Sequence, residues 1–175
     1  MVSSATAYTV LVGLVALERL AELVVSNRNL RWSRRRGGVE IGAGHYPAMV
    51  TLHSVLLLGC LAEVWLLDRP FQPALGWPML ALVLAAQALR WWCIRTLGPQ
   101  WNTRIVVVPG AGRISSGPYR YLAHPNYVAV VLEGLALPLV HTAWLTAVTF
   151  SALNAVLLSV RIRSESAALT MLGRA

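Results

Sequence analysis

Charged residues are scarce in this chain of 175 residues, and lysine is absent altogether. Only 13% of the residues are charged, and all fifteen basic residues are arginine. Hydrophobic residues make up 57% of the chain, and the mean hydropathy is +0.59. Because soluble domains carry about 25% charged residues, this composition excludes an ordinary soluble protein and indicates an integral membrane protein.

Cysteine is also rare, with Cys60 and Cys93 the two in the chain. Both fall within apolar stretches and have no metal-ligand spacing, so we expect them to serve packing and exclude a disulfide framework or a zinc site. No small-residue cleavage site closes the first apolar stretch. That stretch is therefore predicted to be a retained helix and not a removed signal peptide.

Acidic residues are few, and seven acids against fifteen arginines give a formal net charge of +8. Such an excess can indicate nucleic-acid binding. In so apolar a chain, however, arginines are expected to gather on the cytoplasmic side of a bilayer, where they set topology and meet anionic headgroups. The predicted partner is therefore the lipid bilayer and not a nucleic acid.

Long apolar runs are what the sequence does have. A transmembrane helix needs about 20 apolar residues. Three runs qualify, at 5–25, 46–67 and 76–97. A fourth region, 127–160, stays apolar for 34 residues but is interrupted by Pro138 and His141. It is too long for one helix and short for two, so it predicts a tight helical hairpin with arms at 127–140 and 143–160.

The predicted fold is thus an all-α integral membrane protein with about five transmembrane helices, formed by residues 1–175 as one domain. Residues 1–97 would hold three spans, and 98–175 a cytoplasmic loop, the hairpin and a tail. Five arginines lie between the first two spans, and one lies between the second and third. The excess of arginine in cytoplasmic loops then predicts an outside N-terminus and a cytoplasmic C-terminus.

Several charges fall inside the apolar runs, where they are paired or functional by default. Glu18, Arg19 and Glu22 lie in the first run, Arg90 in the third, and Glu133 in the first arm of the hairpin. One interpretation is a buried ion-pair network that fixes helix packing. The other is that Glu133 faces a reaction cavity. For Glu63, near the outer end of the second run, the structural interpretation is preferred.

Two glycine-rich strings, "GGVEIGAG" at 37–44 and "PGAGRISSG" at 109–117, raise the possibility of a nucleotide-binding loop. Neither follows a clear strand and opens a helix, as a dinucleotide fingerprint requires, so both predict turns. The β-branched residues just before the second string predict a short extended segment or hairpin.

The stretch "SGPYRYLAHPNYVAVVLEGLALPLV" at 116–140 places a polar step directly before an apolar arm. On a helix, Arg120 and His124 would share one face, and Pro125 suits a first helical turn. Tyrosines alone would fit an aromatic belt at the membrane surface, but the polar set is denser than anchoring requires. After the last run, "RIRSESAAL" places Arg161 and Glu165 one helical turn apart, on the same predicted edge.

"GPYRYLAHPNYVAVVLEGLALPL" followed by "RIRSESAAL" resembles the isoprenylcysteine carboxyl methyltransferase family of membrane enzymes. The C-terminal half of that family carries an Arg-x-x-x-His-Pro-x-Tyr segment, a helical hairpin and an Arg-Ile-x-x-Glu-Glu element. The resemblance covers about residues 96–172 of this chain. "LERLAELVVSNRN" and "GHYPAMVTLHS" look like a bacterial branch that methylates alkylresorcinols or alkylpyrones, which implies a bacterial inner membrane.

The resemblance implies an O-methyltransferase that binds S-adenosyl-L-methionine between the C-terminal helices and the cytoplasmic loops, without a Rossmann domain. The cofactor-binding residues that it implies are Arg120, Tyr121, His124, Pro125, Tyr127, Arg161 and Glu165. Ser166 stands where the family has its second glutamate, and Ala123 where a basic residue usually precedes the histidine.

Methyl transfer is an in-line displacement that needs alignment and exclusion of water and no metal. The candidate catalytic residues are Glu133 and His124, as bases, and Arg161, which would orient an anionic acceptor. The expected substrate is a lipophilic small molecule such as an alkyl phenol or pyrone, with a prenylcysteine carboxylate as the alternative. It would enter from the bilayer, while the cofactor arrives from the cytoplasm.

Two other functions stay open at this stage. Sterol reductases share a related C-terminal architecture, so the protein could be a membrane reductase that uses NADPH. Alternatively, the intramembrane charges could belong to a small transporter or a structural membrane protein, which would bind neither cofactor.

Overall fold

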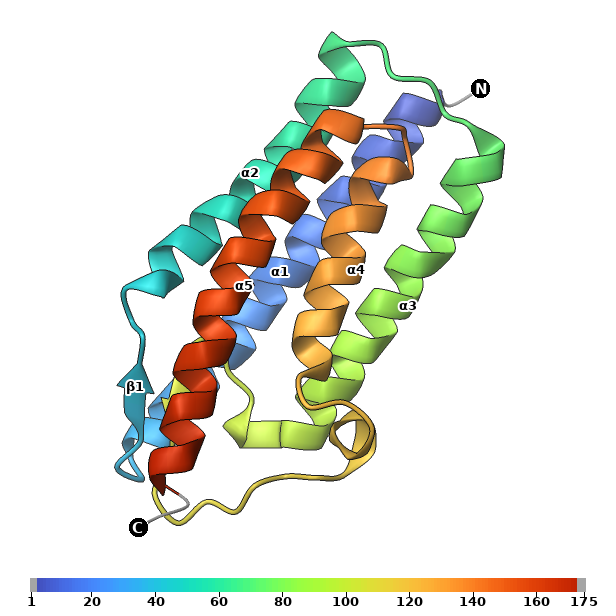
Figure 1. Ribbon diagram of the computed structural model, residues 1–175. Coiled ribbons are helices and arrows are strands. Elements are labelled where there is room, and N and C mark those ends of the chain that lie inside the picture. The colour runs from blue at the N-terminus through green and yellow to red at the C-terminus, as the bar shows by residue number, and fades with distance from the viewer. Residues whose placement is uncertain (1–2, 173–175) are drawn as a thin grey trace.

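Five α-helices form the bulk of the computed structural model, which describes residues 3–172 (Figure 1). The helices are α1 (Ser4–Arg34), α2 (His45–Leu66), α3 (Pro73–Leu97), α4 (Pro125–Leu139) and α5 (Trp144–Leu172). Two short strands and two 3-10 turns complete the fold: β1 (Val39–Ile41), β2 (Ile105–Val107), η1 (Gly98–Gln100) and η2 (Gly117–Arg120). The predicted all-α membrane fold is confirmed.

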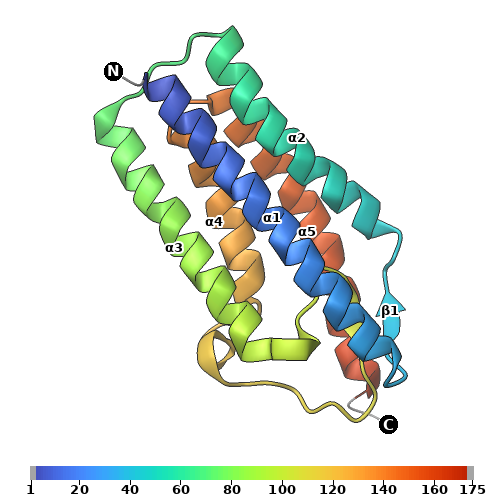
Figure 2. The ribbon, with the colours of Figure 1, turned by 180° about the vertical axis from the view of Figure 1, so that it is seen from behind.

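Three helical segments are long and apolar enough to cross a bilayer, namely His45–Leu66, Pro73–Gln100 and Trp144–Ala167. α4 is apolar but only 15 residues long, and within the described residues α1 is not among the candidate spans. α1 and α4 nevertheless pack in the same bundle, in which α1, α2, α5, α4 and α3 follow one another as neighbours (Figures 1 and 2). That α1 and α4 also cross the membrane stays a prediction.

Two helices are longer than the apolar runs that predicted them. α1 continues from residue 25 to Arg34, and α5 continues from residue 160 to Leu172. Polar residues such as arginine, serine and glutamate are compatible with a helix, so the end of an apolar run does not mark the helix end. The extension of α1 is used structurally, because Asn29 Nδ2 donates to the carbonyls of Gly98 (3.1 Å) and Trp101 (2.8 Å).

The hairpin of α4 and α5 is confirmed, with its turn at residues 140–143. Thr142 has a positive φ of 55°, and its hydroxyl donates to the Pro70 carbonyl at 2.7 Å. Glu63 of α2 caps α5, since its carboxylate accepts from the backbone N–H of Leu145 (3.1 Å) and of Thr146 (2.7 Å). This contact satisfies donors that a helix N-terminus leaves unpaired and supports the structural interpretation of Glu63.

The first loop, the segment 98–124 and the C-terminal end of α5 gather at one end of the bundle, and the N-terminus lies at the other (Figures 1 and 2). β1 and β2 pair antiparallel at the loop end, with Val39 opposite Val107 and Ile41 opposite Ile105. The predicted extended segment is therefore present. Its partner is the first loop and not a local hairpin.

In the helix core, a glycine of α4 leaves room for an aromatic ring of α5. A Cβ at Gly134 of α4 would lie 1.9 Å from Cε1 of Phe150 in α5, so the Phe150 ring occupies the notch that this glycine leaves. Cys60 and Cys93 are buried free thiols, as expected for packing residues.

Candidate active site

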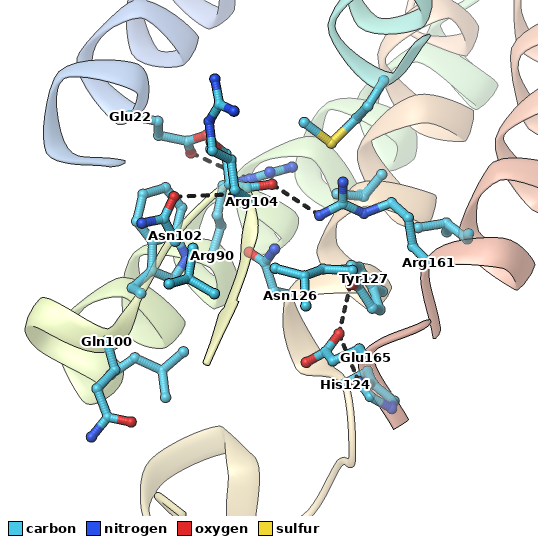
Figure 3. A pocket seen from close by; sticks show the side chains of 18 of the residues that line it. Glu22, Arg90, Gln100, Asn102, Arg104, His124, Asn126, Tyr127, Arg161 and Glu165 are labelled. Atoms are coloured by element: carbon cyan, nitrogen blue, oxygen red, sulfur yellow. Dashed lines mark hydrogen bonds and ion pairs between the residues drawn. The ribbon is translucent and has the colours of Figure 1, made fainter. Parts of the chain in front are cut away.

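A cavity of about 1370 Å³ opens within the bundle, and every helix and the segment 101–115 contribute to its wall. At the loop end its wall is polar, as Figure 3 shows for His124, Tyr127 and Glu165. Further into the bundle, the wall includes apolar residues of α1, α2 and α5, among them Leu20, Leu23, Val50, Leu57 and Leu157. The cavity therefore has a polar loop end and, further in, apolar residues interspersed with the charged residues Arg19, Glu22 and Arg90.

The polar end is organised around Glu165, and we call His124, Tyr127, Arg161 and Glu165 the lip. Tyr127 Oη donates to Glu165 Oε2 at 2.7 Å, and His124 Nδ1 lies 3.8 Å from the same oxygen. The His124 and Tyr127 rings stack with centroids 5.4 Å apart. Pro125 fixes this pair locally, because it occupies the first turn of α4 and leaves His124 as the residue just before the helix.

Arg161 is the buried cation of the lip, with 5% of its surface exposed. Its Nη2 donates to the Thr103 carbonyl at 2.9 Å, and its guanidinium carbon lies 6.0 Å from the centre of the Tyr127 ring. Thr103 is itself tied to α1, since its backbone N–H donates to Ser26 Oγ at 3.1 Å. Arg161 is thus held in place from two elements, while its Nε has no hydrogen-bond partner within the described chain.

Two more buried polar atoms of cavity-lining residues at this end lack a partner among the described residues, namely Asn126 Oδ1 and Trp101 Nε1. An unsatisfied buried polar group costs about 1–3 kcal/mol. Asn126 lines the cavity at the start of α4 (Figure 3), and Trp101 follows η1. Together with Arg161 Nε, they provide one acceptor and two donors for a bound molecule.

Arg120, Tyr121 and Pro125 do not line this cavity. Arg120 ends η2 and lies over the Tyr121 ring at 5.9 Å, and Tyr121 is 74% exposed. The expectation that Arg120 and His124 share a helix face is wrong, because α4 begins only at Pro125 and residues 117–120 form a 3-10 turn. The role of Arg120, Tyr121 and Pro125 in cofactor binding stays a prediction.

Tyr119 of η2, in contrast, does line the cavity. Burial raises the pKa of its hydroxyl above the usual value. Tyr119 is therefore a neutral hydroxyl at working pH, able both to donate and to accept a hydrogen bond.

Glu133 lies in a buried ion-pair network. Its Oε2 is 2.9 Å from Arg90 Nη2 and also pairs with Arg19 Nη2. Glu22 completes the network, at 2.5 Å from Arg19 Nη1 and 3.5 Å from Arg90 Nε. Glu18 accepts instead from the indole N–H of Trp91, at 2.5 Å.

This network matches the packing interpretation of the intramembrane charges. Arg19, Glu22 and Arg90 line the cavity, whereas Glu133 does not. The Glu133 carboxylate is thus paired with two guanidinium groups and lies outside the cavity wall. The role of Glu133 as a base stays a prediction that its position disfavours.

Sequence reasoning missed other residues of the cavity wall, including His53 in α2, Asn154 in α5 and Arg104. Arg104 pairs with Glu40 at 2.7 Å and lies over the Tyr46 ring at 3.9 Å. Lone polar residues in apolar runs were the available signal for His53 and Asn154, since such residues usually face a bundle interior.

Comparison with known proteins gives two matches. The model of the isoprenylcysteine carboxyl methyltransferase (ICMT) family matches residues 79–171, a range that includes the whole lip. The uncharacterised protein YpbQ of Bacillus subtilis (strain 168) is 41% identical over 163 residues, which cover 93% of this chain and 96% of that protein. No solved structure matches the chain.

Proposed function

Because the chain belongs to the isoprenylcysteine carboxyl methyltransferase family of membrane methyltransferases, we propose that it transfers a methyl group from S-adenosyl-L-methionine to an oxygen of a lipophilic small molecule. The observation that carries this proposal is the lip, where a buried arginine, a carboxylate and unsatisfied polar atoms meet at the mouth of a partly apolar cavity.

The residues of the lip fit this cofactor by their chemistry. The free Nε of Arg161 suits the cofactor's carboxylate, and the Glu165 carboxylate suits a ribose hydroxyl or the ammonium group. Asn126 Oδ1 offers a further acceptor and Trp101 Nε1 a further donor. When bound, the cofactor supplies an electrophilic methyl group on a sulfonium, and the lip residues bind it, orient it and limit the access of water.

The apolar wall favours an acceptor that carries a hydrocarbon chain. Leu20 and Leu23 of α1, Val50 and Leu57 of α2, and Leu157 of α5 would surround that chain, at about 0.8 kcal/mol per buried methylene. An alkyl phenol, a pyrone or a prenylcysteine carboxylate meets this requirement. Ser166 lines the cavity beside Glu165 and would meet the cofactor in place of the family's second carboxylate.

We further propose that residues 1–175 act as one membrane domain of a bacterial inner membrane, with the N-terminus outside and the lip on the cytoplasmic side. The end of α1, the first loop and segment 98–124 lie at the lip end, and residues 26–44 and 98–124 carry eight of the fifteen arginines, whereas Arg69 lies between α2 and α3 at the other end (Figure 1). Arginine-rich loops favour the cytoplasmic side, from which a soluble cofactor would enter.

Isothermal titration of the purified full-length protein in nanodiscs tests the proposal. We expect heat of binding with S-adenosylhomocysteine and none with NADPH. Arg161→Ala should abolish that heat, because it removes the buried cation of the lip. Arg163→Ala is the matched control, since Arg163 is exposed on the same helix and does not line the cavity. Heat with NADPH alone would show a reductase, and heat with neither would favour a non-enzymatic membrane protein.

A further inference from the structure

The end of α1 carries an arginine-rich surface that belongs neither to the lip nor to the cavity wall. Arg28, Arg31 and Arg35 are exposed, and their spacing of three and four residues places them on one side of the helix. Arg36 follows, and its guanidinium carbon lies 4.2 Å from the centre of the Trp32 ring. We call these four arginines and Trp32 the arginine face.

Within the described residues, no carboxylate pairs with the arginine face. The one acid of the first loop, Glu40, pairs instead with Arg34 at 3.8 Å and with Arg104 at 2.7 Å. Four positive charges on one short segment therefore keep their full field for a partner outside the chain.

The arginine face lies just beyond the helices that could cross a bilayer. The apolar run of α1 ends at residue 25, and the last turns of α1 extend past the first residue of the candidate span α2, beside β1 (Figure 2). Arg28 and Arg31 follow that run by about 4.5 and 9 Å along the helix axis. The headgroup region adds about 5–8 Å to each side of the hydrocarbon core, and a long arginine side chain reaches back toward it. Lipid phosphates are therefore within reach.

The opposite side of the same segment holds the lip. Ser26, Asn29 and Ser33 are buried, and each lies two residues before an arginine of the face, a rotation of about 200° on a helix. Ser26 Oγ accepts from the Thr103 N–H at 3.1 Å, and the Thr103 carbonyl accepts from Arg161 Nη2 at 2.9 Å. Two hydrogen bonds thus connect α1 to the buried cation of the lip.

We propose that the arginine face binds the headgroups of anionic phospholipids, and that this contact holds the end of α1 in the position from which it supports the lip. An anionic bilayer then raises the affinity for the cofactor, and by linkage bound cofactor raises the affinity for anionic lipid by the same factor. The headgroup site is independent of the reaction, whereas its effect on the cofactor rests on the proposed methyltransferase function.

Anionic phospholipid is the occupant that chemistry and position favour. Guanidinium groups bind phosphate through paired hydrogen bonds, and each basic residue near an anionic bilayer surface contributes about fivefold in affinity. Trp32 adds an aromatic ring of the kind that is enriched at membrane–water interfaces. Because the face belongs to a helix packed into the bundle, the leaflet around it is the partner at the highest local concentration.

Spin-labelled lipids test the headgroup site in the full-length protein. In nanodiscs, the wild type should immobilise spin-labelled phosphatidylglycerol in preference to phosphatidylcholine, as measured by electron spin resonance. Arg28→Gln/Arg31→Gln should reduce this preference severalfold, because it removes the two charges nearest the bilayer. Added salt should weaken the wild-type preference in the same way, since it screens exposed charges.

Arg95→Gln/Arg163→Gln is the matched control. Both arginines are exposed, lie outside the cavity wall and belong to the loop ends of their helices, so this variant loses the same charge from the same end of the bundle. It should keep the wild-type preference. Melting curves followed by tryptophan fluorescence verify that both variants are folded. An equal loss of preference in the two variants would show a diffuse charge effect and overturn the inference.

Titration with S-adenosylhomocysteine tests the effect on the lip. We expect about fivefold tighter binding in an equal mixture of phosphatidylglycerol and phosphatidylcholine than in phosphatidylcholine alone, and no such difference in Arg28→Gln/Arg31→Gln. Ser26→Ala should keep the lipid preference but lose the difference in affinity, because it removes the hydrogen bonds to Asn102 and Thr103. Equal affinity of the wild type in both nanodiscs would overturn the inference.

The outcomes separate this inference from the proposed function. Cofactor binding without a preference for phosphatidylglycerol overturns only the inference. A preference that depends on Arg28 and Arg31, with no cofactor binding in either nanodisc, overturns the methyltransferase and keeps the headgroup site. If the wild type does not select phosphatidylglycerol but binds poly-glutamate through the same arginines, the face takes an acidic protein, and the inference is overturned.

Discussion

Glu165 is the residue at which the predicted site residues converge. It accepts from Tyr127 and lies beside His124, and Arg161 lies one turn earlier on the same helix. A hydrogen bond to a charged group contributes about 1.5–3 kcal/mol. The Tyr127 hydroxyl therefore orients the carboxylate before any ligand arrives.

Tyr127→Phe tests this orientation. We expect the affinity for S-adenosylhomocysteine to fall about tenfold, corresponding to about 1.4 kcal/mol, because the carboxylate loses its fixed direction but remains in place. Titration calorimetry measures the change. The resemblance implies that Tyr121 binds the cofactor, whereas the structure leaves it 74% exposed. Tyr121→Phe should therefore leave the affinity unchanged. An equal loss of affinity in Tyr121→Phe would place the cofactor site elsewhere.

The motif predicted that His124, Tyr127, Arg161 and Glu165 lie together, and the structure places them together. Their role in cofactor binding stays a prediction. The sequence could not predict that Arg120 and Tyr121 are exposed and lie outside the cavity wall, because a 3-10 turn and a helix that starts at Pro125 are set by tertiary contacts. It also missed His53 and Asn154. A single polar residue in an apolar run has no partner at a diagnostic spacing, and only the folded bundle brings the two walls together.

Among the elements, the α2–α5 contact at the end away from the lip includes one buried carboxylate, Glu63. Glu63 accepts hydrogen bonds from two backbone N–H groups of α5 and forms an ion pair with Arg69 at 2.9 Å. The apolar runs of the sequence predicted where the helices lie, since a membrane helix is built from apolar residues. They did not predict where α1 and α5 end, because both helices continue into polar sequence that carries no capping signal.

Glu63→Ala should lower the free energy of unfolding by about 3 kcal/mol, because it removes the cap of α5 and leaves Arg69 without its partner. Thermal unfolding in detergent, followed by tryptophan fluorescence, measures the loss. Asp68→Asn is the control, as Asp68 is exposed and asparagine tolerates its positive φ of 47°. Affinity for S-adenosylhomocysteine should persist in both variants, since the lip lies at the opposite end.

For the molecule as a whole, His141 joins three segments at the end away from the lip. Its ring lies 5.2 Å from that of Tyr8 and 6.0 Å from that of Phe71, and its Nε2 is 3.3 Å from Ser4 Oγ. Burial lowers the pKa of His141 below its ordinary value. Protonation therefore disfavours the folded state at this junction.

The sign of the pH dependence follows. Between the lowered folded pKa and the unfolded value of about 6.5, the unfolded chain binds more protons, so stability rises with pH. The stability contributed by the neutral ring is present above about pH 6.5 and is lost as the pH falls toward the folded pKa. We expect His141→Gln to reduce the difference in melting temperature between pH 7.5 and pH 5. An unchanged difference would contradict this assignment.

The hydrogen bonds from Ser26 and Asn29 to the segment 98–103 link the evolution of α1 to that of the C-terminal half of the chain. The family match begins at residue 79, yet the backbone that holds Arg161 is fastened to a helix that ends before residue 35. A relative that acquired a different first helix by recombination would keep the lip but lose the hydrogen bonds from α1 that hold the segment 98–103. The two halves of the gene are therefore expected to have diverged together, and a chimera should bind cofactor only when the helix and the segment come from the same parent.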